Sequence, residues 1–232
     1  MIKTSLQIAL VAAAVWALPA QAVVTVQWDF ETAVEPAAST SWTGIAASTG
    51  TGSASGVHAA SATWSTPTGN GSANSASATA WAVGDYWQFN FSTSGFTGLA
   101  LSFDQTSSNT GPRDFTLAYS TNGTTFTNFA SYAVLANATP NPTWSSSTYN
   151  AVYTLAYDLS AVTALNNQAS VFVRLFNNST VSANGGVVAA TGTSRIDNFT
   201  VNVTPVPEAG TSAMLLAGLA VLGFLGRRRV QA

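Results

Sequence analysis

The sequence predicts an all-β protein whose body folds as a two-sheet β-sandwich. Apolar and polar residues alternate with a period of two in several short runs, as in strands with one buried face. Glycine- and asparagine-containing turn signals separate these runs, and a helical pattern is almost absent from the body. Many short strands joined by turns are typical of two packed sheets rather than of a helical or mixed fold.

The first predicted strand covers residues 23–31, where Val24, Val26, Trp28 and Phe30 alternate with polar residues. Residues 36–84 follow, and they contain no Asp, Glu, Lys or Arg and are rich in Ser, Thr, Ala and Gly. We expect short, loosely specified strands joined by glycine-containing loops in this segment.

Clear alternation returns after residue 84 and predicts strands at residues 87–91, 99–104 and 115–119. After the last of these, Asn122-Gly123 lies between two alternating runs, which predicts a hairpin in which both turn residues adopt positive φ. Further strands are predicted at residues 149–158, 170–177 and 194–204, with a single helical turn after the first of them, capped by Asp158 or Ser160.

Residues 1–22 have the layout of a secretory signal peptide. Lys3 is followed by an apolar stretch at residues 6–18 and by Ala20-Gln21-Ala22, a small-x-small cleavage site. The apolar stretch is shorter than a membrane-spanning helix requires. We therefore expect cleavage after Ala22 and a mature chain that starts at Val23, with one domain at residues 23–205.

The last 27 residues, 206–232, have three parts. Val206-Pro207-Glu208-Ala209 leads into an uncharged apolar run at residues 209–226, and Arg227-Arg228-Arg229 follows. Eighteen helical residues span about 27 Å, close to the thickness of a bilayer core, so the run is predicted to be a single membrane helix. The arginines would remain on the cytoplasmic side, which places the body outside. A buried core helix and a permanent anchor are the alternatives.

This arrangement resembles the PEP-CTERM sorting signal of exported bacterial proteins. The resemblance implies recognition by an exosortase, a membrane-bound cysteine enzyme that cuts near the motif, and a place in the cell envelope, at the cell surface or in the extracellular matrix. It also implies an association with exopolysaccharide. The third motif position is Ala209 where the signal has proline, which leaves the removal of the helix open.

Charge is sparse in residues 23–205, which contain three arginines and eight acids and so carry a net charge of −5. The absence of lysine and of any basic patch excludes nucleic acid and anionic membrane surfaces as partners of this part of the chain. His58 is the single histidine of the chain, and there is no cysteine. We therefore expect no enzyme activity, although a carboxylate pair of the glycosidase kind stays open.

Asp197 is the candidate metal ligand. Alternation in the last strand puts Arg195, Asp197 and Phe199 on one face, so the aspartate lies beside the core and needs a partner. Arg195, Arg174 and a cation are the three alternatives. Residues 28–31, 119–123 and 195–201 resemble jelly-roll domains of the carbohydrate-binding and galactose-binding-like kind. That resemblance implies a structural Ca²⁺ held by Glu31 and Asp197, and carboxylate oxygens are ligands that Ca²⁺ prefers.

Four tryptophans are candidates for stacking on sugar rings, because they lie outside the clearest alternating runs. They are Trp42, Trp64, Trp81 and Trp144. Core packing is the alternative for each. Three functions therefore stay open from the sequence, and the first two are a non-catalytic surface or matrix protein associated with exopolysaccharide and a carbohydrate-binding module with structural calcium. A secreted hydrolase of the glycosidase type is the third.

Overall fold

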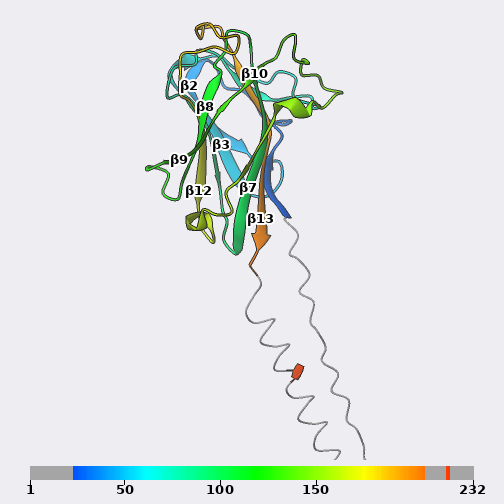
Figure 1. Cartoon of the computed structure of the whole chain (residues 1–232), viewed down its shortest axis with the longest axis vertical. Coiled ribbons are helices and arrows are strands. Elements are labelled where there is room, and N and C mark those ends of the chain that lie inside the picture. Colours follow the sequence, from blue (N-terminus) through cyan, green and yellow to red (C-terminus); the bar gives the residue numbers. More distant parts are fainter. Residues whose placement is uncertain (1–22, 207–217, 220–232) are drawn as a thin grey trace, which may run out of the picture.

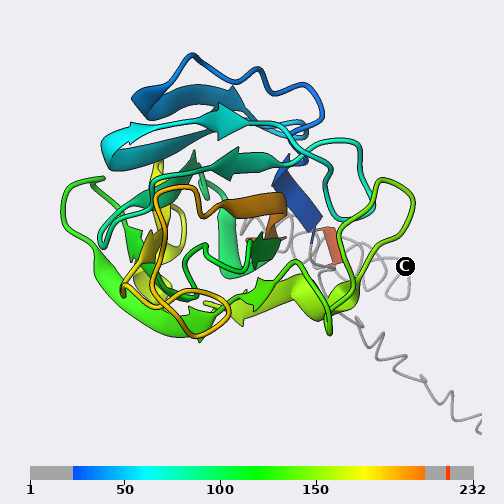
Figure 2. The same ribbon diagram turned by 90° about the horizontal axis from the view of Figure 1, so that it is seen from above.

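Two β-sheets packed face to face form the body, as predicted (Figures 1 and 2), and their strands pair antiparallel except at the short pairing of Leu135–Ala136 with Thr106–Ser107. The computed structural model describes residues 23–206 and 218–219. The seven-stranded sheet contains β1 (Val23–Trp28), β4 (Trp64–Ser65), β5 (Ala76–Ala78), β7 (Phe96–Ser107), β10 (Leu135–Ala136), β11 (Thr154–Asp158) and β13 (Ser194–Pro205). The six-stranded sheet has the order β2 (Ser39–Ala46), β3 (Gly52–Ala62), β6 (Tyr86–Phe91), β12 (Val171–Asn177), β8 (Asp114–Ser120) and β9 (Thr127–Ala133).

Aromatic rings from both sheets meet in the core. The rings of Phe89 on β6 and Phe199 on β13 stack with centroids 3.6 Å apart, and Trp28 on β1 contacts both edge to face, at 5.2 Å and 5.8 Å. All three side chains are fully buried. The apolar positions of the alternating runs thus supply the rings that pack between the two sheets.

The glycine-rich segment is more ordered than the sequence predicted. Within it, β3 runs for eleven residues, and Gly56 lies against two tryptophan rings. A Cβ atom at this position would come within 2.5 Å of the Trp64 ring and 2.8 Å of the Trp87 ring. The prediction of short, loosely specified strands is therefore wrong for β3, because the small residues leave the volume that the tryptophans fill.

The last strand contains a bulge that the alternation argument missed. Asn198 adopts a positive φ of 51°, and the pairing of β13 with β7 shifts register between Asp197 and Thr200. Ser194 and Ile196 point inward before the bulge, and Phe199 points inward after it, while Arg195 is only half-buried. The prediction that Arg195 shares a face with Phe199 is therefore wrong, because a bulge adds one residue to the count.

The predicted hairpin joins β8 to β9, but its turn is wider than predicted. Six residues, 121–126, connect the strands, and only Gly123 of the two turn residues has positive φ, at 73°. The Asn122 side-chain oxygen instead accepts hydrogen bonds from the backbone N–H groups of Thr124 and Thr125. The asparagine thus orders the loop through its side chain and not through a left-handed backbone.

Replacing Gly123 by valine is expected to destabilise this hairpin by about 1–3 kcal/mol, because a β-branched residue is strained at positive φ. The new Cβ atom would also lie 3.0 Å from the Phe172 ring. Urea unfolding of the full-length protein checks this, with Gly95→Val as the control that shares the strain, since Gly95 has φ of 80° but open space around it. Equal losses in the two variants would show that the Phe172 contact adds nothing.

Two smaller predictions need correction around β11. The predicted strand at residues 149–158 begins only at Thr154, because a 3₁₀ turn, η1 (Ala151–Tyr153), precedes it. The predicted helical turn is η2 (Thr163–Leu165), and no side chain caps it. The Asp158 carboxylate instead accepts the Ser160 backbone N–H at 2.8 Å, which closes a turn before η2.

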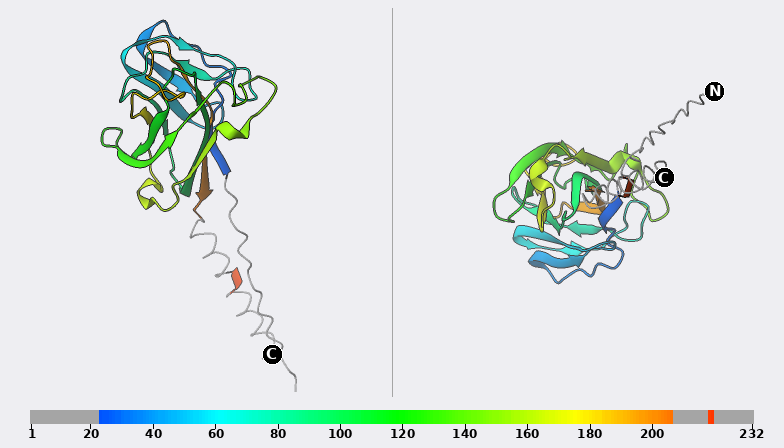
Figure 3. Two further views of the ribbon diagram at one scale, coloured as in Figure 1. Left: turned by 45° about the horizontal axis from the view of Figure 1, so that its top comes forward. Right: turned by 90° about the horizontal axis from the view of Figure 1, so that it is seen from below.

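Both ends of the described body lie together. β1 pairs antiparallel with β13, with Val23 opposite Val203, so the start of β1 and the end of β13 emerge from one end of the sandwich (Figures 1 and 3). The predicted signal peptide and membrane helix lie outside the described residues, and within the described part no helix has the length and apolarity needed to cross a membrane.

Candidate functional site

The outer face of the six-stranded sheet carries an unusual set of side chains. Tyr86 and Gln88 on β6 lie opposite Phe176 and Arg174 on β12, and Asn90 lies opposite Phe172 in the next row. All six side chains are half-buried. We call this surface, together with Phe126 of the β8–β9 loop, the aromatic face.

Arg174 is the centre of the aromatic face. Its guanidinium carbon lies 4.1 Å from the centroid of the Tyr86 ring and 3.8 Å from that of the Phe126 ring. Its Nε donates a hydrogen bond of 2.7 Å to the side-chain oxygen of Gln88. The arginine is therefore held in one orientation by two cation–π contacts and one hydrogen bond.

The outer face of the other sheet offers a contrast. Its corresponding row across four strands consists of Gln27, Thr200, Ser102 and Ala156, paired in that order. This row has no ring and no charge, although Asp104, Asp158 and Arg195 occupy other outward positions of the same sheet. What distinguishes the six-stranded sheet is therefore the set of rings around a cation and not the presence of charge.

Sequence reasoning missed this face, although a signal was present. In residues 171–176 the inward positions are Val171, Val173 and Leu175, and the outward ones are Phe172, Arg174 and Phe176. Two phenylalanines at outward positions break the apolar-in, polar-out rule for a half-buried strand. Attention to outward rings, and not to tryptophans alone, would have found the site.

The four tryptophans proposed as sugar platforms are buried. Their exposed fractions are 3% for Trp42, 3% for Trp64, 5% for Trp81 and 6% for Trp144. The first three pack with Trp87 in the core at ring separations of 5.7–6.4 Å, and Trp144 packs on Tyr153. The prediction that they stack on sugars is therefore contradicted by their burial, and the packing alternative describes them.

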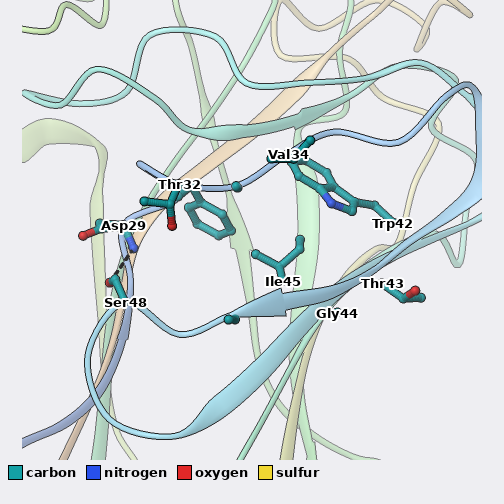
Figure 4. A pocket seen from close by; sticks show the side chains of 11 residues that line it. Asp29, Thr32, Val34, Trp42, Thr43, Gly44, Ile45 and Ser48 are labelled. Atoms are coloured by element: carbon teal, nitrogen blue, oxygen red, sulfur yellow. Dashed lines mark hydrogen bonds between the residues drawn. The ribbon is translucent and has the colours of Figure 1, made fainter.

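Trp42 also contributes to a pocket of about 270 Å³ between the segment after β1 and strand β2 (Figure 4). The Asp29 backbone N–H donates to the Ser48 hydroxyl at one side of it, at 3.3 Å. The lining combines apolar side chains, including Val34 and Ile45, with polar ones, including the hydroxyls of Thr32 and Ser48.

Asp197 is buried, but its partners are not arginines. One carboxylate oxygen accepts the Asn70 backbone N–H at 2.9 Å and the Ser72 hydroxyl at 2.6 Å, and the other accepts the Asn198 N–H at 2.8 Å. The salt-bridge alternative is therefore wrong. Glu31 is exposed and accepts the Asn74 backbone N–H at 2.9 Å, so both predicted metal ligands bind the loop at residues 69–75.

Burial raises the pKa of Asp197 to about 7, and the three hydrogen bonds and the nearby Asp104 modify this shift. Around Gly69 the structure gathers oxygen atoms: a Cβ atom at this glycine would lie 2.0 Å from the Ser72 hydroxyl, 2.3 Å from the Asn74 carbonyl oxygen and 2.3 Å from the Asp197 carboxylate. Hard cations prefer such oxygen donors. The described residues contain no cluster of three His, Cys, Asp or Glu side chains for a metal, and the calcium site stays a prediction.

His58 has an acidic neighbour that the sequence did not reveal. Its ring nitrogen lies 3.5 Å from a carboxylate oxygen of Asp85, and both side chains are almost fully buried. The imidazole packs between the Trp64 and Trp81 rings, and burial lowers its pKa. The two Asp85 oxygens accept backbone N–H groups of Ala59 and Ala82, so this pair joins strand β3 to the turn before β6.

The C-terminal residues were compared with known protein families. Residues 205–229 match the PEP-CTERM protein-sorting motif. The chain carries a PEP-CTERM sorting motif. The match includes Pro207, Glu208, Ala209 and the three arginines, although residues 207–217 and 220–229 lie outside the described structure. The motif implies processing by an exosortase-type enzyme and marks the chain as exported to the cell envelope or surface.

Solved structures similar to this chain include adhesin and carbohydrate-binding domains. The K2 cleaved adhesin domain of Lys-gingipain, a protein of Porphyromonas gingivalis, is 14% identical over 80% of this chain and 98% of that one, with a TM-score of 0.39. A structure described as CBM4 is 14% identical over 77% and 85%, with a TM-score of 0.32.

An exo-β-agarase is also similar, at 14% identity over 80% of this chain but only 26% of that one, with a TM-score of 0.38. With TM-scores below 0.5, these likenesses say nothing about what this chain binds. No curated protein sequence matches the chain.

Proposed function

We propose that this chain is a non-catalytic cell-surface protein that binds extracellular polysaccharide through the aromatic face. The observation that supports it is the row of Tyr86 and Phe176 beside the row of Gln88 and Arg174. Sugar rings present C–H groups that pack on aromatic side chains, while their hydroxyls need donors and acceptors at the edge. The aromatic face supplies both kinds of group within two adjacent strands.

The sorting motif supports the location at which such binding is useful. A protein exported to the cell surface meets extracellular polysaccharide in quantity, so weak binding at each site is sufficient when many copies are present. Because both ends of the body emerge from one end of the sandwich, the aromatic face lies on a side wall. A chain held by one terminus would therefore leave this wall free to contact a long polymer.

Affinity electrophoresis of the full-length protein in gels containing different polysaccharides tests the proposal. We expect retardation by at least one polymer and a loss of up to about tenfold in affinity for Phe176→Ala, since a packing contact with an aromatic ring is worth roughly 0.5–1.5 kcal/mol. Phe129→Ala is the matched control, because this phenylalanine is 37% exposed and lies near Tyr157, away from the aromatic face. Equal losses in both variants, or no binding to any polymer, would overturn the proposal.

We also propose that the chain is processed at both ends, with a signal peptide at residues 1–22, a domain at 23–205 and a sorting segment at 206–232. Intact-mass analysis of the protein from its native host is expected to give a species that begins at Val23, ends near residues 207–209 and is lighter than the 23.8 kDa precursor. A recovered protein that always retains Arg227–Arg229 would indicate a permanent anchor. Replacing the three arginines by serine is expected to release the tail from its stop at the membrane.

We further propose a structural calcium ion at the loop of residues 69–75. Asp197, the Ser72 hydroxyl and the Asn74 carbonyl would supply oxygen ligands, and Glu31 adds a carboxylate on the other side of Asn74. The oxygen atoms gathered at Gly69 and the buried carboxylate with a raised pKa support this assignment. A cation there would stabilise the ionised form of Asp197, which burial disfavours. It would also link the segment after β1 to the start of β13.

A further inference from the structure

Arg174 has no acidic partner in the part of the chain that the structure describes. Among the residues that the structure describes, the ion pairs join Arg113 to Asp114 and His58 to Asp85, and none includes Arg174. The outward residues beside it on the neighbouring strands, Gln88 on β6 and Ala118 on β8, are uncharged. Asp114, at the start of β8, is the acid on this side of the sheet, and it pairs with Arg113. In a body with a net charge of −5, the aromatic face thus has a positive charge of its own.

The contacts of the Arg174 guanidinium group leave its two terminal nitrogens available to a ligand. The Tyr86 and Phe126 rings both lie against it, and its Nε donates to Gln88. The two terminal nitrogens have no hydrogen-bond partner among the described residues. Two parallel N–H donors in one plane are the geometry that a carboxylate accepts in a bidentate pair.

Partial burial of the Arg174 charge also favours an anionic ligand. Burial lowers the pKa of Arg174, which means that partial removal from water makes the charged form less favourable, while Tyr86 acts in the opposite direction. A bound anion offsets that cost, whereas a neutral hydroxyl offsets less of it. An arginine needed only to cover the sheet would be served equally well by an aliphatic side chain.

We propose that the polysaccharide bound by the aromatic face is acidic, and that Arg174 pairs with the carboxylate of a uronic-acid unit. This inference rests on the proposed function, because it names the chemical class of the same ligand. The uronate carboxylate lies against the edge of the guanidinium, and the sugar unit next to it packs on the row of Tyr86 and Phe176. No bond is made or broken in this contact.

The test measures the affinity of the full-length protein for three polymers of different charge: polygalacturonate, neutral dextran and dextran sulfate. We expect polygalacturonate to bind at least tenfold more tightly than dextran, and its affinity to fall as salt is raised from 50 to 500 mM. Arg174→Gln is expected to weaken polygalacturonate binding about 10- to 100-fold, as for the loss of a charge-assisted hydrogen-bond pair. Dextran binding is expected to weaken far less, because the glutamine amide still offers a donor to a hydroxyl.

Two further variants separate the effect of the paired N–H donors of Arg174 from the effect of its charge. Arg174→Lys keeps the charge without the planar pair of donors, so we expect it to recover only part of the affinity. Arg195→Gln removes the same charge from β13 in the other sheet and is expected to bind like the parent protein. Melting temperatures of all variants show whether each is folded.

The outcomes distinguish this inference from the proposed function. If dextran binds as tightly as polygalacturonate and Arg174→Gln changes neither, the acidic ligand is wrong while polysaccharide binding stands. If dextran sulfate binds as well as polygalacturonate and Arg174→Lys matches the parent, charge alone is recognised and the carboxylate pairing is wrong. If no polymer binds, the proposed function fails and this inference fails with it.

Discussion

Replacing Trp28 by alanine is expected to lower the free energy of unfolding by about 3–5 kcal/mol, the usual cost of removing a large buried ring. The Trp28 side chain is fully buried and packs edge to face against the stacked pair of Phe89 and Phe199, and its indole N–H donates to the Ile45 carbonyl oxygen at 3.2 Å. The substitution removes the ring that contacts both sheets and leaves that carbonyl without its donor. Since domains are commonly stable by only about 5–15 kcal/mol, the variant is expected to be close to unfolding.

Urea unfolding of the full-length protein, followed by tryptophan fluorescence and circular dichroism, measures this loss. Phe129→Ala is the control, because this partly exposed ring is expected to cost about 1 kcal/mol or less. A Trp28→Ala midpoint equal to that of the control would mean that the two sheets are not joined through this ring cluster.

The second large effect is expected from calcium and depends on Asp197. Calcium at a hundred times its dissociation constant should stabilise the folded state by about 2.7 kcal/mol, which is a rise in melting temperature of about 5–10 °C for a domain of this size. Asp197→Asn keeps the shape of the side chain but removes its charge, so the rise should largely disappear. Asp158→Asn, which alters an exposed acid away from the loop, should retain the full rise.

The stability of the protein is expected to depend on pH in opposite directions without and with calcium. Without calcium, the folded-state pKa of Asp197 of about 7 lies above its ordinary value of 3.8, so the folded state holds a proton that the unfolded state releases. The stability contributed by the protonated group is therefore complete below pH 4 and is lost as the pH rises through 7. Calcium binds the ionised form, so its stabilising effect should instead grow over the same range.

Comparing the parent protein with Asp197→Asn at each pH isolates this contribution. The lowered pKa of His58 causes a loss of stability at acidic pH, but that loss is common to both proteins and cancels in the difference. Melting temperatures in calcium and in EDTA between pH 5 and 8 provide the measurement. A parent protein that melts identically in both, at every pH, would show that no calcium binds.

The strands were predictable where one face is apolar and the other polar. Phe89, Leu101 and Val173 all follow that rule, and all are fully buried. The rule depends only on the pleat of a strand, so it needs no knowledge of which strands pair. Strand order did require the structure, because it is set by contacts between residues far apart in the chain, such as β1 with β13.

The site was less predictable, for two physical reasons. The bulge at Asn198 reverses the alternation, so that residues before and after it do not follow one inward-outward pattern. The local composition does not predict this bulge. Of the tryptophans predicted to bind sugar, Trp64 fills space that Gly56 leaves open on β3, and Trp42 and Trp81 pack with it on Trp87. That complementarity appears only when the two segments are brought together.

Hydroxyl-radical footprinting of the full-length protein, with and without its tightest-binding polysaccharide, tests the central claim most directly. It reports the solvent access of individual rings. We predict that oxidation of Tyr86, Phe126 and Phe176 slows when the polymer is bound, while Phe129 and Tyr149, which are 37% and 54% exposed, keep their rates. Unchanged oxidation of the three rings at saturating polymer, with protection elsewhere on the sandwich, would contradict binding at the aromatic face.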